Sequence, residues 1–181
     1  MSKRTAAGLI PVIALALLGL WVSSAQAANP ATINVTVMIQ NLSVSATGPI
    51  AFGTVLASSE TVSGSASTVT NDGNVTETYS LSLANPGGWT AVQAAPSGAE
   101  EFALLAQFNS SGPTAVSFTY ANHALSTSST PSSGTKFAGN QTGLSVAVSG
   151  TRSLWFRFNA PTSTAVTTQQ TIVVTVTAAA G

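Results

Sequence analysis

The chain is poor in the side chains that carry chemistry. Its 181 residues include no cysteine, one histidine, five acidic residues and five basic residues. Without cysteine there can be no disulfide, no thiol redox centre and no thiolate metal site. Most hydrolytic, transfer and redox enzymes need paired acids and bases, an activated nucleophile or a metal cage. The composition therefore predicts a protein that is not an enzyme and uses no cofactor.

The first 27 residues have the order of segments that is typical of a secretory signal peptide. Lys3 and Arg4 form a basic start, residues 6–22 are apolar apart from one proline, and residues 23–27 end in Ala-Gln-Ala. This order predicts cleavage after Ala27 and a secreted, extracellular or cell-surface location. The alternative is a membrane anchor, because an apolar stretch of about 17 residues lies at the lower edge of spanning length. With no lipid-attachment cysteine and no apolar tail, we expect no stable membrane anchor after cleavage.

Residues 28–181 are predicted to form one domain. They carry three basic and five acidic residues, so their net charge is −2 with histidine neutral. A nucleic-acid partner needs a basic patch, and an anionic membrane surface also attracts basic residues, so we expect neither partner. The abundance of Ser, Thr, Val, Ala and Gly is typical of all-β extracellular domains.

Alternating apolar and polar residues predict a series of short strands. The clearest alternation covers residues 33–39, 61–70, 75–83, 116–120, 144–148, 154–158 and 172–176, with shorter strands after Pro49 and at Trp89. Asn71-Asp72-Gly73-Asn74 predicts a hairpin turn, and residues 121–142 a long loop. Residues 97–108 fit either a capped helix or a strand, and we favour the strand. Eight to ten strands without interleaved helices predict an all-β, antiparallel immunoglobulin-like sandwich in a single domain.

The few candidates for chemistry lack partners. His123 stands alone in the predicted loop, where we expect it to be solvated, and one histidine makes neither a triad nor a zinc site. Glu100 and Glu101 are adjacent, so in a strand they point to opposite faces and are expected to be surface charges. Asp72 and Asn74 supply too few oxygens for calcium. No catalytic, metal-binding or cofactor-binding residue is predicted.

One group of side chains is a candidate binding face. Trp155 and Arg157 alternate with Leu154, Phe156 and Phe158, so they lie on the opposite face of the predicted strand. With Tyr120 they could hold a sugar ring or a partner chain on an exposed sheet. The alternative is that a loop or a second sheet covers them.

Two stretches resemble known secreted proteins. Residues 34–55 (NVTVMIQNLSVSATGPIAFGTV) are similar to the opening of pilus subunits of the spore-coat-U type, which join an alternating strand to P-x-x-F-G-T. The cysteine that this family usually has near Leu42 is missing here. Residues 69–89 (VTNDGNVTETYSLSLANPGGW) resemble a hairpin of bacterial immunoglobulin-like modules. The resemblance implies an immunoglobulin-like sandwich in a surface module or filament subunit, and it transfers no catalytic residue.

These observations predict a structural role. The first hypothesis is a subunit of an extracellular filament or surface assembly that polymerises by β-strand addition, with Ile33, Val35, Val37 and Ile39 as the inserted side chains. The alternative for this strand is pairing within its own sheet. The second hypothesis is a carbohydrate-binding or adhesive module, with a glycan held by Tyr120, Trp155 and Arg157.

Overall fold

The computed structural model describes residues 32–181, and the chain forms two units, Met1–Val37 and Met38–Gly181. The predicted signal peptide, residues 1–27, lies outside the described residues. Residues 32–37 of the first unit have no helix or strand. No helix in the described part of the chain is long and apolar enough to cross a membrane.

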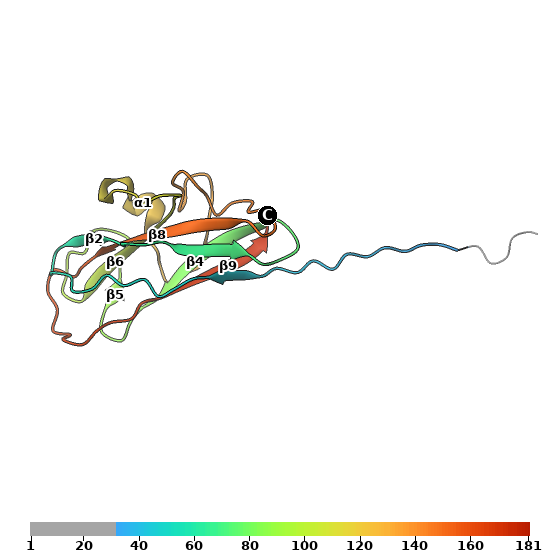
Figure 1. The fold of residues 1–181 in the computed structure, drawn as a ribbon. Helices are drawn as coiled ribbons and strands as arrows, with labels where there is room; N and C mark the ends of the chain where they lie inside the picture. The colour runs from blue at the N-terminus through green and yellow to red at the C-terminus, as the bar shows by residue number, and fades with distance from the viewer. Residues whose placement is uncertain (1–31) are drawn as a thin grey trace, which may run out of the picture. The chain divides into compact units, whose positions relative to one another are not determined.

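The second unit is built from two sheets (Figure 1), so the prediction of an all-β fold is confirmed. The larger sheet has the order β1 (Val44–Ala46), β3 (Ser67–Asn71), β8 (Thr151–Asn159), β6 (Glu101–Phe108) and β5 (Thr90–Ala91), and β2 (Glu60–Val62) also pairs with β8. The smaller sheet has the order β7 (Thr130–Pro131), β4 (Glu77–Ala84) and β9 (Val173–Ala180). All pairs are antiparallel except β5 with β6. The helical elements are η1 (Ala115–Ser117) and α1 (Tyr120–His123).

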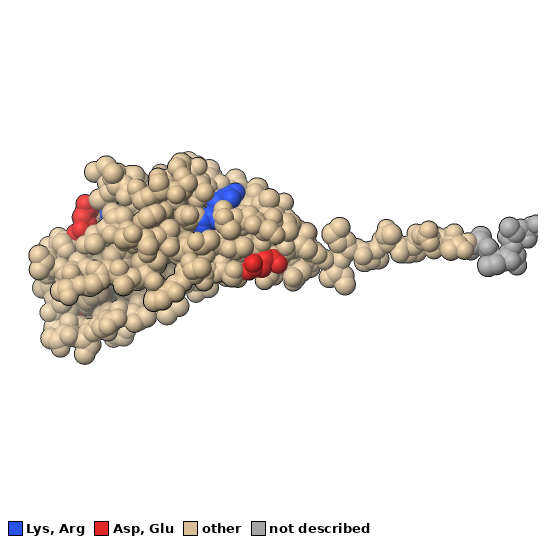
Figure 2. Space-filling view, viewed as in Figure 1, with Lys and Arg blue, Asp and Glu red and all other residues tan. Residues whose placement is uncertain are grey.

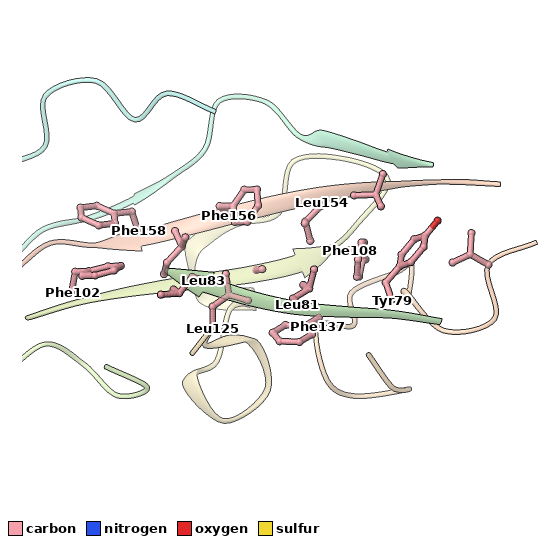
Figure 3. Packing of buried hydrophobic residues seen from close by; sticks show 14 of the residues in the cluster. Tyr79, Leu81, Leu83, Phe102, Phe108, Leu125, Phe137, Leu154, Phe156 and Phe158 are labelled. Carbon is pink, nitrogen blue, oxygen red and sulfur yellow. The ribbon is translucent and has the colours of Figure 1, made fainter. Parts of the chain in front are cut away.

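The two sheets share one apolar core, which Figure 3 shows from close by. The smaller sheet contributes Tyr79, Leu81 and Leu83 of β4, which are at most 4 % exposed. The larger sheet contributes alternate residues of β8, among them Leu154 and Phe156. Their alternation in the sequence follows from the pleat of a strand with one buried face.

The turn at residues 71–74 was expected to close a hairpin, and that prediction is wrong. The strand before it, β3, pairs with β1 and β8, whereas the strand after it, β4, pairs with β7 and β9. The turn therefore carries the chain from one sheet to the other. Asn71 fixes this crossing, because its side-chain amide donates to the carbonyl oxygens of Val75 and Val146, both at 2.9 Å.

Several other predicted strands differ from the structure. Residues 61–70 are not one strand, because residues 63–66 separate β2 from β3. Residues 116–120 fold into η1 and the start of α1, and within residues 144–148 only Val146 makes a bridge, to Glu77. Residues 33–39 have no strand partner within the described structure. The favoured strand within residues 97–108 is confirmed, since β6 begins at Glu101.

Candidate functional site

The smaller sheet ends in an unpaired edge. β9 pairs with β4 along its whole length, from Ala84 with Val173 to Glu77 with Ala180, and no described strand pairs with its other side. The amide and carbonyl groups on that side are free to bond to another strand. Such an edge is a template for pairing with an added chain.

The inward side chains of β9 are only partly covered. Val174 and Val176 pack against the core but remain partly exposed, whereas Leu81 and Leu83, which pair with Val176 and Val174 on the neighbouring strand, are 0 % and 4 % exposed. The side chains of β9 are more exposed than those of β4 because β4 is paired with strands on both sides, whereas β9 is paired with β4 alone. The core is therefore covered less completely along β9 than along β4.

The opposite wall is an irregular segment. β1 lies beside β9, as its dark teal arrow shows in Figure 1, but residues 47–57 after it form no strand. Ile50, Phe52 and Val55 of this segment pack partly buried against the core. The ring centroids of Phe52 and Phe158 are 5.6 Å apart. These contacts hold the segment against the larger sheet without pairing it to β9.

Between this segment and β9 lies an open groove of about 1120 Å³. Its floor is made of core residues of the larger sheet, namely Leu104, Leu154, Phe156 and Phe158. None of the residues that line the groove is charged. Figure 2 likewise shows charged atoms at only a few places on the face drawn. The chemistry of the groove therefore suits an uncharged, apolar occupant.

One rim of the groove is held by hydrogen bonds to Glu100. The Thr164 hydroxyl donates to Oε2 at 2.6 Å, and the Ala165 amide donates to Oε1 at 2.5 Å. These bonds hold the pKa of the Glu100 carboxyl below its ordinary value. The Trp89 indole, which lines the groove, donates from Nε1 to the Thr164 hydroxyl at 3.0 Å. Glu100 is thus an anchor for the segment before β9. Glu101 bonds separately, to the amides of Ser97 and Gly98.

The predicted donor side chains are exposed. Ile33, Val35, Val37 and Ile39 are between 80 % and 83 % exposed. Their alternation would place all four on one side of a strand. All four side chains are apolar and uncharged.

The structure places Tyr120, Trp155 and Arg157 in one cluster, in which Arg157 is buried and Tyr120 and Trp155 are half-buried. Arg157 is 5 % exposed, and its Nη1 donates to the carbonyl oxygens of Ala115 and Phe118 at 2.7 and 3.3 Å. Its guanidinium carbon lies 5.4 Å from the Tyr120 ring centroid. The Trp155 Nε1 donates to the Asn109 carbonyl oxygen at 2.9 Å. The Arg157 and Trp155 side chains therefore bond to main-chain carbonyl groups of the same chain, which holds residues 109–118 against β8, and the glycan-binding face stays a prediction.

His123 was expected to be solvated, and that prediction is wrong. His123 is 4 % exposed. Its Nδ1 accepts from the Thr119 amide at 2.9 Å, and its Nε2 lies 3.0 Å from the Ala138 carbonyl oxygen. Burial lowers the pKa of the imidazole. Within residues 32–181, no group of three His, Asp or Glu side chains could hold a metal ion. The histidine serves to join α1 to the loop after it.

The sequence predicted a strand at residues 172–176, which β9 extends to Ala180, but it gave no sign that this strand borders a groove. The free edge of β9 arises because no described strand pairs with it, and a local sequence pattern does not show which strands pair. The irregular wall was also missed, because Ile50 and Phe52 alternate as in a strand. Comparisons with protein-family models, curated proteins and solved structures find no match. The geometry of the groove therefore carries the functional conclusion.

Proposed function

We propose that this protein is a secreted structural subunit that assembles into an extracellular filament by β-strand addition. In this proposal the chain is exported, residues 1–27 are removed, and the domain is an immunoglobulin-like sandwich. Residues 33–39 of one copy then enter the groove of the next copy. The added strand pairs with the free edge of β9 and fills the core with alternate side chains.

The observation that carries the proposal is the match between the groove and the donor segment. The groove has an unpaired strand edge on one side and core residues as its floor, and its lining has no charge. The donor side chains are β-branched, apolar and at least 80 % exposed. Burial of a large apolar side chain contributes about 1.5–3 kcal/mol, so several of them can hold two copies together.

Engineered cysteines test the pairing directly, because the chain has none of its own. One variant carries Thr36→Cys, on the side of the donor opposite Val35 and Val37. A second carries Thr175→Cys or Thr177→Cys, which are exposed on β9. Paired strands bring facing residues within disulfide distance. Oxidation of a mixture of the two variants should therefore give covalently linked copies for at least one of these pairs.

The matched control is Ser128→Cys, an exposed residue of the loop before β7. Mixed with Thr36→Cys, it should remain monomeric on a denaturing gel. Equal cross-linking to Ser128→Cys would mean that the reaction reports random collision. Filaments that form without any link between residue 36 and β9 would show that another surface joins the copies.

A further inference from the structure

The chain just after the donor segment is bound to its own domain by one side chain. The Asn74 carboxamide accepts from the Asn41 amide at 2.7 Å through Oδ1 and donates to the Ile39 carbonyl oxygen at 2.7 Å through Nδ2. The Asn74 main-chain amide also donates to the Asn41 carbonyl oxygen at 3.1 Å. One carboxamide thus supplies a donor and an acceptor to one side of the chain, as a neighbouring strand would.

A buried carboxylate binds the next residues. Glu77 is 0 % exposed, and its Oε1 accepts from the Ser43 amide at 2.7 Å. The Asp72 amide donates to the Ser43 carbonyl oxygen at 2.8 Å, and the β1–β3 ladder begins at Val44 with Asn71. Gly73 makes room for this arrangement, because a Cβ there would lie 2.4 Å from Glu77 Oε1 and 2.5 Å from the Asn41 carbonyl oxygen.

We infer that Asn74 and Glu77 form a clamp that ends the donor strand at Met38, so that Ile39 is not among the inserted side chains. This inference rests on the proposed strand addition and narrows its donor to Ile33, Val35 and Val37. The clamp consists of the hydrogen bonds from Asn74 and Glu77 to residues 39–43.

Main-chain hydrogen bonding sets this boundary. A strand added to the groove runs beside β9 and uses its own amide and carbonyl groups to pair. The Ile39 carbonyl and the Asn41 and Ser43 amides are already bonded to the clamp. Inserting Ile39 would require breaking these bonds, whereas inserting Ile33, Val35 and Val37 would leave them intact. Asn74 and Glu77 are positioning residues, since neither lines the groove.

Two aspartate variants test the boundary. Val37 and Ile39 are 82 % and 81 % exposed, so Val37→Asp and Ile39→Asp should both leave the free subunit folded. A charge inside an apolar groove is strongly disfavoured, so Val37→Asp should abolish filaments in sedimentation and negative-stain microscopy. Ile39→Asp should assemble with a critical concentration within about twofold of wild type, because exposed changes have small effects.

The outcomes separate this inference from the proposed function. If Ile39→Asp stops assembly as completely as Val37→Asp does, Ile39 is inserted and the clamp is not the boundary. If Val37→Asp still forms filaments, this segment is not the added strand. The proposed function and the boundary at Met38 are then both wrong. Circular dichroism of each free variant shows whether it is folded.

Asn74→Ala tests the clamp in the free subunit, whether or not filaments form. Hydrogen exchange of the Asn41 amide should become about fivefold faster or more, because its acceptor is lost. The control is Asn140→Ala, another exposed asparagine whose side chain bonds to the Ser110 amide and hydroxyl at 2.8 Å. It should leave exchange at Asn41 unchanged. Unchanged exchange at Asn41 in Asn74→Ala would overturn the clamp.

Discussion

A Val174→Thr variant would separate the proposed role of the groove in assembly from its role in the fold of the subunit. Val174 is one of the two β9 residues that line the groove, with Val176, and it pairs with Leu83 across the smaller sheet. Threonine has nearly the shape of valine and a similar preference for strands, so the backbone should not change. The substitution replaces one methyl group by a hydroxyl that needs a hydrogen-bond partner.

The effect should differ between the free and the assembled subunit. In the free subunit the groove is open, so the hydroxyl reaches water and the free energy of unfolding should fall by less than about 1 kcal/mol. Under an added strand the same hydroxyl is buried in an apolar lining. An unpaired buried hydroxyl costs about 1–3 kcal/mol. Since about 1.4 kcal/mol is a factor of ten, the association constant should fall about 5- to 150-fold.

Two measurements on the same protein give these two quantities. Urea unfolding of the free subunit gives the free energy of unfolding, and the critical concentration for filament formation gives the association constant. Val173→Thr is the matched control, because Val173 is 56 % exposed and lies on the opposite face of β9. It should change neither quantity. If Val174→Thr lowers the free energy of unfolding of the free subunit by as much as it weakens association, the groove is already filled in the free subunit.

Three further predictions concern the buried tyrosine, the histidine and the leader. The Tyr79 hydroxyl is buried without a hydrogen-bond partner, and burial raises the pKa of Tyr79 to about 12. Tyr79→Phe should therefore leave the free energy of unfolding equal to wild type or up to about 1 kcal/mol higher, and a large loss in urea unfolding would mean that the hydroxyl has a partner. Because burial lowers the pKa of His123, the unfolded chain binds its proton first, and the free energy of unfolding should fall as the pH drops below about 6.5. His123→Gln should remove that dependence, since this is the only histidine, and an unaltered profile in urea titrations would contradict the assignment. Intact-mass measurement of exported protein should give a chain that begins at Ala28, and a mass that retains residues 1–27 would favour the anchor.

The sequence predicted best the strands in which apolar and polar side chains alternate every two residues. Residues 77–84, 151–159 and 173–180 are strands, and Leu81 and Phe156 face the core, because a pleated strand with one buried face must alternate. Glu77 escaped notice although it shares the buried face of β4 with Tyr79. Its Oε1 accepts from the Ser43 amide, a contact between residues far apart in the chain, whereas its Oε2 is buried without a hydrogen-bond partner.

The sequence could not predict the features set by distant contacts. Asn71-Asp72-Gly73-Asn74 has the composition of a hairpin turn, yet composition alone does not tell which sheet the next strand joins. The alternation at Val116, Phe118 and Tyr120 indicated a strand, but only Phe118 is fully buried there, and the guanidinium of Arg157 bonds to the carbonyl oxygens of this segment. The groove itself depends on the outer edge of β9, which no strand of the described residues pairs with, although β1 lies nearby.

The position of Trp89 gives the protein an optical reporter of its own. Trp89 lines the groove and stacks on Phe158, with ring centroids 5.9 Å apart. Trp155 packs instead with the separate cluster around Phe118, and Trp21 lies in the leader that we expect to be removed. A strand that enters the groove would exclude water from the Trp89 indole and leave Trp155 unaffected. Tryptophan emission should then shift to shorter wavelength as subunits join, so polymerisation can be followed in real time without any label.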